Sequence, residues 1–144
     1  MRVYLDNCTF NRPFDDRHSL DMFFEINAKL AIQQMIRSGA LELTWSDILE
    51  FENNDNPHLE RRTQIAEWKN LAFEKIAFNE TIFAKSQKYM KLGLRDKDAL
   101  HVACAVFGGC DFFITVDKKI LNKAIREIAV INPVTFLWRL QNVN

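Results

Sequence analysis

Residues 112–117 read Phe-Phe-Ile-Thr-Val-Asp, a strongly apolar run that ends in a carboxylate. Such a run, without polar alternation, is typical of a strand buried on both faces in the middle of a parallel sheet. Residues 2–6, Arg-Val-Tyr-Leu-Asp, have a similar form. We therefore predict buried strands over 2–5 and 112–116, each with an aspartate, Asp6 or Asp117, directly at its carboxyl end.

The rest of the chain supplies two further strands and a series of helices. Leu41, Leu43 and Trp45 alternate with polar residues and predict a strand over 40–45, and a fourth strand is predicted over 128–131. Helices are predicted at about 19–37, 47–53, 59–78, 81–92, 95–107, from 118, and 133–140. This alternation predicts one α/β domain over residues 1–144, a three-layer sandwich whose central parallel sheet of four to five strands is flanked by helices.

Composition excludes several classes of protein. A hydrophobic fraction of 48% and a charged fraction of 26% suit a globular domain, and no stretch approaches the roughly 18–20 apolar residues of a membrane span. The three cysteines form no Cys-x-x-Cys pair, and the opening residues lack the apolar stretch of a signal peptide. We therefore expect a soluble, cytoplasmic protein with reduced thiols and no membrane partner.

Charge is unevenly divided along the chain, although the formal net charge is zero. Residues 1–60 carry 11 Asp and Glu against 5 Lys and Arg, whereas residues 61–144 carry 8 against 14. This asymmetry is compatible with a polyanionic partner that meets the second half.

Four carboxylates are candidates for one site. Ligands of open parallel sheets bind outside the carboxyl ends of the strands, which is where Asp6 and Asp117 fall, while Glu52 and Asp98 lie near the ends of predicted helices. Carboxylates brought together repel one another, and a divalent cation relieves that repulsion. An all-oxygen ligand set, with no nearby Cys or His spacing, favours Mg²⁺ or Mn²⁺ over Zn²⁺. Phosphodiester hydrolysis is the chemistry that such a site performs.

The segments around these acids resemble the acidic motifs of PIN domains, and most of all those of the VapC-like toxins of VapBC-type toxin–antitoxin pairs. The resemblance runs from residue 3 to about residue 135. The matching segments are Tyr4-Leu5-Asp6-Asn7, Ser46 with Glu52 six residues later, Asp98-Ala99-Leu100-His101-Val102-Ala103, and Phe113-Ile114-Thr115-Val116-Asp117.

This resemblance implies a PIN-like fold and a Mg²⁺- or Mn²⁺-dependent endoribonuclease, the toxin of a type II pair. Asp6, Glu52, Asp98 and Asp117 would be the catalytic, metal-binding quartet, and Thr115 the hydroxyl often found two residues before the last acid. The resemblance also implies an RNA substrate, a homodimer and an antitoxin protein as partner.

Some positions leave alternatives open. Asn7 stands where the family often has Thr or Ser, and its amide can still bind a water or orient Asp6. Glu50 competes with Glu52 as the second acid, although the spacing from Ser46 favours Glu52. Asp96 is a candidate N-cap beside Asp98, and Arg12 is a candidate phosphate contact.

Each feature also has a purely structural interpretation. Asp6 suits a turn, Asp117 a helix N-cap, and Asp98 compensation of a helix dipole. His101 suits a packed histidine satisfied by a neighbour. The basic residues of the second half suit either a phosphate-binding surface or a solvated helix face; they are Lys85, Lys88, Lys91, Arg95, Lys97, Lys118, Lys119 and Lys123.

Two other functions compete with the nuclease. A phosphatase or phosphotransfer domain on a parallel sheet usually shows Asp-x-Asp after the first strand, and Asp6-Asn7-Cys8 lacks the second acid. A catalytically inactive PIN-like module that binds RNA or protein is the other alternative, and the presence of all four acids disfavours it.

Overall fold

The computed structural model describes residues 1–10 and 19–142, in which five strands form one sheet. Every pairing is parallel, and the strand order is β3-β2-β1-β4-β5. The strands are β1 (Arg2–Leu5), β2 (Glu42–Ser46), β3 (Glu74–Ile76), β4 (Phe112–Ile114) and β5 (Ala129–Ile131). The prediction of an α/β fold with a parallel sheet of four to five strands is confirmed.

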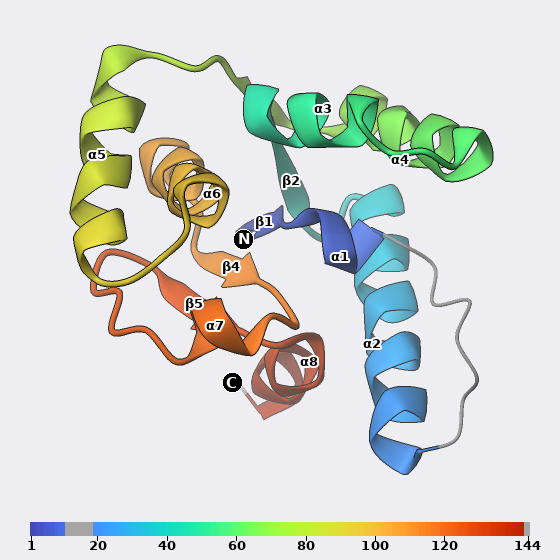
Figure 1. Cartoon of the computed structure of the whole chain (residues 1–144). Coiled ribbons are helices and arrows are strands. Elements are labelled where there is room, and N and C mark those ends of the chain that lie inside the picture. The colour runs from blue at the N-terminus through green and yellow to red at the C-terminus, as the bar shows by residue number, and fades with distance from the viewer. Residues whose placement is uncertain (11–18, 143–144) are drawn as a thin grey trace.

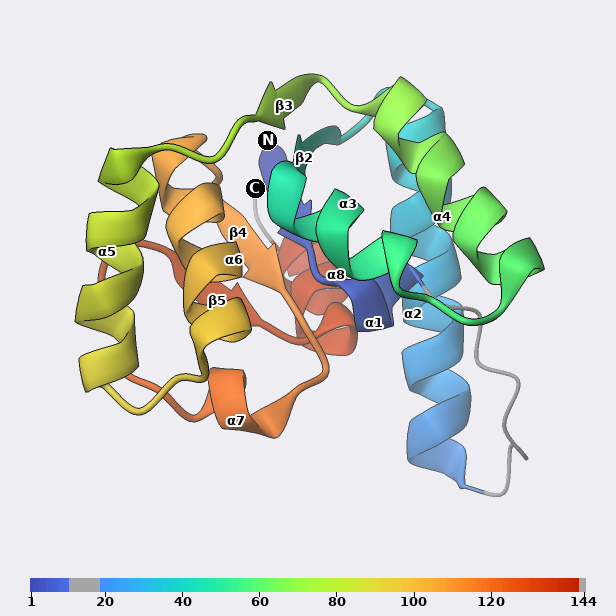
Figure 2. The same ribbon diagram turned by 45° about the horizontal axis from the view of Figure 1, so that its top comes forward.

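Helices cover both faces of this sheet (Figures 1 and 2). Helices α5 and α6 pack together on one face, and α2 and α8 pack together on the other. The helices are α1 (Asn7–Phe10), α2 (Leu20–Arg37), α3 (Asp47–Asn54), α4 (Leu59–Leu71), α5 (Glu80–Lys91), α6 (Asp96–Phe107), α7 (Lys118–Leu121) and α8 (Pro133–Asn142). Within the described ranges, no helix is both long enough and apolar enough to cross a bilayer.

Aromatic side chains on the two central strands fill both layers between sheet and helices. Tyr4 of β1 stacks on Phe113 of β4, with 5.3 Å between ring centroids, and tilts against His101 of α6 at 5.7 Å. Phe112, next along β4, packs edge-on against Phe136 of α8 at 5.2 Å. Because β1 and β4 are covered on both faces, their sequences lack the polar alternation of a half-exposed strand.

The predicted helix over 59–78 is wrong in its second half. Helix α4 ends at Leu71, and the chain then runs into β3, whose Glu74 lies opposite Thr44 of β2. Pairing with β2 decides this outcome: the backbone N–H of Phe73 donates to the carbonyl of Leu43 at 2.8 Å. Leu71, the last residue of α4, is 47% exposed. No Gly or Pro marks the change, so tertiary pairing overrides a continuous helical pattern.

A short helix that the sequence did not predict follows the first strand. Helix α1 begins at Asn7, directly after Asp6, and Thr9 donates its backbone N–H to the carbonyl of Asp6 at 3.0 Å. The turn redirects the chain at the carboxyl end of β1 and brings the Thr9 side chain back towards Asp6. The polar loop predicted from Asn11, including Arg12, lies outside the described residues.

Replacing Phe136 with alanine tests the packing of α8 on the sheet. Phe136 is fully buried against Phe112, so its truncation is expected to lower the free energy of unfolding by about 3–5 kcal/mol. Trp138 on the same helix is 63% exposed, and Trp138→Ala should change stability by no more than about 0.5 kcal/mol. Urea denaturation followed by circular dichroism measures both, and equal losses would contradict this packing.

Candidate functional site

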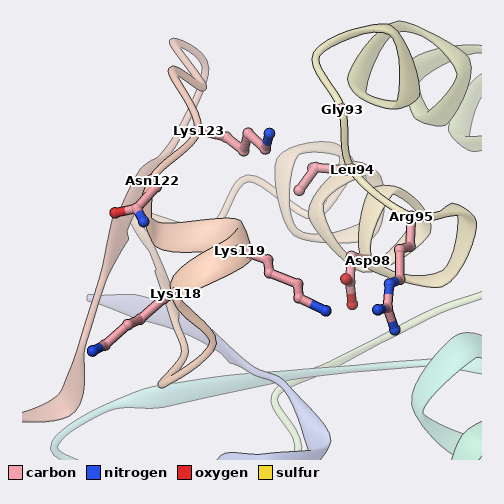
Figure 3. A pocket seen from close by; sticks show the side chains of 8 residues that line it. All are labelled: Gly93, Leu94, Arg95, Asp98, Lys118, Lys119, Asn122 and Lys123. Atoms are coloured by element: carbon pink, nitrogen blue, oxygen red, sulfur yellow. The ribbon is translucent and has the colours of Figure 1, made fainter.

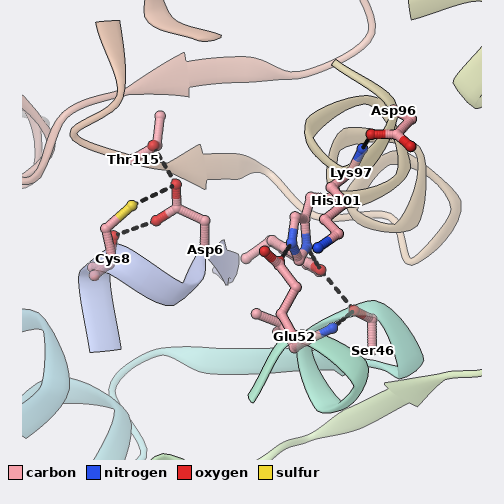
Figure 4. Close-up of polar contacts among 11 residues, drawn as sticks. Asp6, Cys8, Ser46, Glu52, Asp96, Lys97, His101 and Thr115 are labelled. Atoms are coloured by element: carbon pink, nitrogen blue, oxygen red, sulfur yellow. Dashed lines mark hydrogen bonds and ion pairs between the residues drawn. The ribbon is translucent and has the colours of Figure 1, made fainter. Parts of the chain in front are cut away.

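The carboxyl ends of β1 and β4 lie next to each other and hold Asp6 in place. Leu5 is paired with Ile114, so the residues that follow, Asp6 and Thr115, leave the sheet side by side. Asp6 is only 5% exposed, and its carboxylate accepts hydrogen bonds from the hydroxyls of Thr9 (2.9 Å) and Thr115 (Figure 4). The Cys8 thiol lies 3.4 Å from the same carboxylate.

Thr115 joins Asp6 to Asp117. Its hydroxyl donates to Asp6 and accepts the backbone N–H of Asp117 at 3.0 Å. Asp117 in turn caps α7, because its carboxylate accepts the backbone N–H of Lys119 at 2.9 Å. The N-cap interpretation of Asp117 is therefore correct, and it coexists with a position at the same edge as Asp6.

Glu52 reaches this edge from α3 and is held there by His101. Ser46, the last residue of β2, caps α3 by accepting the backbone N–H of Leu49 at 3.2 Å. Glu52 then pairs with Nε2 of His101, a residue of α6 that is only 2% exposed. The other imidazole nitrogen, Nδ1, lies 2.6 Å from the Tyr4 hydroxyl, which is also 2.6 Å from the Ser46 hydroxyl.

If the imidazole of His101 is neutral, the direction of every hydrogen bond in the row Glu52–His101–Tyr4–Ser46 is fixed. An ionised Glu52 only accepts, so Nε2 of His101 must carry the proton and Nδ1 must accept from Tyr4. The Tyr4 oxygen can then accept from Ser46, whose own oxygen accepts the Leu49 amide. His101 is thus the satisfied, packed histidine that the sequence favoured, and it also orients one of the predicted acids.

Burial and neighbouring groups shift the pKa values of Asp6, Asp98 and Glu52 in different directions. Burial raises the pKa of Asp6, against the hydrogen bonds from Thr115 and Thr9. Burial also raises the pKa of Asp98, and the negative charges of Asp117, Asp6 and Glu52 raise it further while His101 opposes them. For Glu52, burial is outweighed by His101, together with Lys97 and Asn7, and the pKa lies below its ordinary value.

The four predicted acids are therefore brought within electrostatic range of one another. Asp6, Glu52 and Asp117 each act on the pKa of Asp98. In the observed side-chain conformations, however, no three His, Cys, Asp or Glu side chains of residues 1–10 and 19–142 are grouped closely enough to hold one metal ion. Glu52 points to His101 rather than to Asp6.

The donors at this edge nonetheless suit a hard divalent cation. They are carboxylate oxygens without a thiolate or an imidazole pair, which is the ligand chemistry of Mg²⁺ and Mn²⁺. The side-chain oxygen of Asn7, between Asp6 and the pocket beside Glu52, is buried and finds no hydrogen-bond donor in the described part of the chain. An ion's hydration water would supply such a donor.

The supporting residues predicted from the sequence fall in different places. Glu50 pairs with Lys69 of α4 at 2.6 Å, away from His101. Glu52 is therefore the glutamate at the acidic edge, the name used below for the edge of the sheet where Asp6, Glu52, Asp98 and Asp117 lie. Arg95 is the N-cap of α6, and Asp96 is the first residue of that helix. The carboxylate of Asp96 accepts the backbone N–H of Lys97. Asn7 forms a side-chain hydrogen bond that lowers the pKa of Glu52. Arg12 lies outside the described residues.

Sequence reasoning missed the role of Thr9, Tyr4 and Ser46 around the acids. Thr9 is three residues after Asp6, a spacing that brings two side chains together only if the segment is helical. Tyr4 contacts both Ser46 and His101, and it meets Ser46 because β1 and β2 are neighbours. Only the strand order could have revealed this, and a sequence without aligned relatives does not supply it.

Comparison with known proteins supports the fold. Neither the known family models nor the curated proteins give a match to this chain. Among solved structures, a chain of VapBC2 from Rickettsia felis, crystallised with a DNA fragment from its promoter, superposes with a TM-score of 0.56. The two chains are 12% identical, and the match covers 92% of this chain and 98% of the other. At that identity the likeness concerns architecture alone, and the architecture is PIN-like.

Replacing Thr115 with valine tests the bridge between Asp6 and Asp117. Valine keeps the shape of threonine but removes the hydroxyl that stabilises the charged form of Asp6. Loss of a supporting partner of this kind typically costs about 10- to 100-fold in metal affinity or activity. If Asp6 binds a metal ion, we therefore expect the Mn²⁺ concentration that gives half-saturation of binding to rise by a factor in that range. Thr115→Ser keeps the hydroxyl and should stay close to wild type, whereas equal effects of both variants would exclude the hydroxyl as the cause.

Proposed function

We propose that this protein is a divalent-cation-dependent endoribonuclease that hydrolyses RNA phosphodiester bonds. The observation that carries the proposal is the meeting of carboxylates from four separate elements at the carboxyl edge of a parallel sheet. Asp6 directly follows β1, Glu52 and Asp98 lie on α3 and α6, and Asp117 is the N-cap of α7, three residues beyond the end of β4. A phosphatase mechanism through Asp6 has less support, because no second acid stands beside it in the short helix α1.

The chain's own residues have distinct parts in this proposal. Asp6 would be the central ligand, because hydroxyls of Thr9 and Thr115 fix both of its oxygens. Asp98 and Asp117 would complete the ligand set from α6 and the end of β4. Glu52, which pairs with His101 in this structure, would join it from α3 once its side chain turns from the imidazole towards the other acids. Mg²⁺ or Mn²⁺, when bound, supplies the positive charge that binds the scissile phosphate and activates water for attack.

A cleavage assay with matched variants tests the function. Purified protein is incubated with a mixture of structured and single-stranded RNA, with Mg²⁺ or Mn²⁺ and with EDTA, and the products are separated on a denaturing gel. We expect cleavage with either ion, none with EDTA, and a loss of at least about 100-fold in Asp6→Asn and Glu52→Gln, more than a supporting partner costs.

Glu50→Gln is the matched control for Glu52→Gln. It makes the same chemical change two residues away on α3, where Glu50 forms a half-exposed pair with Lys69. Such pairs contribute at most about 1 kcal/mol to stability, so this variant should cleave like wild type. Cleavage that resists EDTA, or that persists in Asp6→Asn, would reject the proposal. RNA binding without any cleavage would favour the inactive module.

We further propose a homodimer and an antitoxin protein as partner. Support comes from the fold shared with a chain of VapBC2, which was crystallised bound to promoter DNA. Co-expression with a short open reading frame adjacent to the gene is expected to yield a co-purifying complex that no longer cleaves RNA. Light scattering of the protein alone should give twice the mass of the 16.9 kDa chain. A monomer would refute the dimer, and failure to co-purify would argue against that neighbour as antitoxin.

A further inference from the structure

A pocket of about 420 Å³ opens beside Asp98, on the side of the acidic edge away from Glu52. It lies between the loop that leads into α6 and the helix α7 (Figure 3). Its lining residues are Gly93, Leu94, Arg95, Asp98, Lys118, Lys119, Asn122 and Lys123. Four of these eight are cations, and the one carboxylate is a member of the candidate site.

The cations of this pocket have no acidic partner within residues 1–10 and 19–142. Other basic side chains of the chain do pair, such as Lys69 with Glu50 and Lys88 with Glu127, whereas Arg95, Lys118, Lys119 and Lys123 enter no ion pair there. Figure 3 shows the Lys119 and Arg95 side chains extending towards Asp98. Four positive charges gathered around a single carboxylate indicate an anionic ligand.

The opposite side of the acidic edge has a different character. A smaller pocket of about 230 Å³ is lined there by Asn7, Glu52, Asn53, Asp55, Asn56, Arg61 and Ile65. It combines two carboxylates with a single cation. Among the described residues, the pocket lining on the Lys119 side therefore carries more positive charge than the pocket lining on the Glu52 side.

We infer that the pocket between Arg95 and Lys123 binds a backbone phosphate of the RNA strand, next to the phosphate placed at the acids. This inference rests on the proposed nuclease function and specifies the path of its substrate. RNA fits better than an acidic peptide, because a nucleic acid that puts one phosphate at the acids brings neighbouring phosphates with it. Three of the four cations are lysines, which bind phosphate as point charges without demanding a fixed geometry.

Salt-dependent RNA binding tests the inference separately from cleavage. All variants are made in the Asp6→Asn background, and binding of a short fluorescein-labelled single-stranded RNA of mixed sequence is measured by anisotropy between about 50 and 200 mM KCl. The slope of log K against log salt is negative, and each lost phosphate contact reduces its magnitude by about 0.7 for single strands. Lys119→Gln and Lys123→Gln should each show this loss and bind about fivefold more weakly near 0.1 M salt.

Lys75→Gln is the matched control, since Lys75 is an exposed lysine on β3, at the other edge of the sheet. The slope of log K against log salt for Lys75→Gln should equal that of the Asp6→Asn protein without a lysine substitution. Equal slopes in all variants would overturn the phosphate pocket, even if the wild-type protein cleaves RNA. Polyglutamate that competes with the RNA at equal charge concentration would also overturn it in favour of an acidic protein. If the lysine variants bind weakly but the wild type never cleaves, the pocket stands and the nuclease proposal fails.

Discussion

A carboxylate buried at the end of the central strand is the constraint on which the rest of the site depends. Asp6 is nearly inaccessible to water, and a charged carboxylate in such a place is costly unless hydrogen bonds and opposite charge compensate it. The protein provides only part of this compensation, through Thr9 and Thr115. The pKa of Asp6 stays raised, so the residues around this carboxylate compensate its charged form only in part.

The neighbouring acids differ from Asp6 in how they are compensated. Glu52 already has a partner in His101, which holds its pKa low. Asp98 forms no such pair within residues 1–10 and 19–142, and the surrounding negative charge adds to the effect of its burial while His101 opposes it. The hydrogen bond that orients Glu52 also keeps it from closing a three-ligand group with Asp6.

Much of the fold and the placement of the acids could be predicted from the sequence. The runs that end in Asp6 and Asp117 had the composition of doubly buried strands, and parallel strands end at one edge. By contrast, Glu74–Ile76 is a strand only because β2 offers it hydrogen-bond partners, which no local pattern encodes. The contact between His101 and Glu52 joins residues 49 positions apart, and it depends on how α6 crosses the sheet.

The unequal charge of the two halves of the chain acquires a different meaning in the folded protein. The acidic edge takes Asp6 and Glu52 from the first half and Asp98 and Asp117 from the second, so it does not reproduce the division along the chain. The cations of the pocket beside Asp98, however, all come from residues 93–123. At physiological ionic strength, exposed charges more than about 8 Å away are largely screened. A chain with zero net charge can therefore attract a polyanion at this pocket, because the cations that line it, and not those acids of residues 1–60 that lie beyond this distance, dominate the local potential.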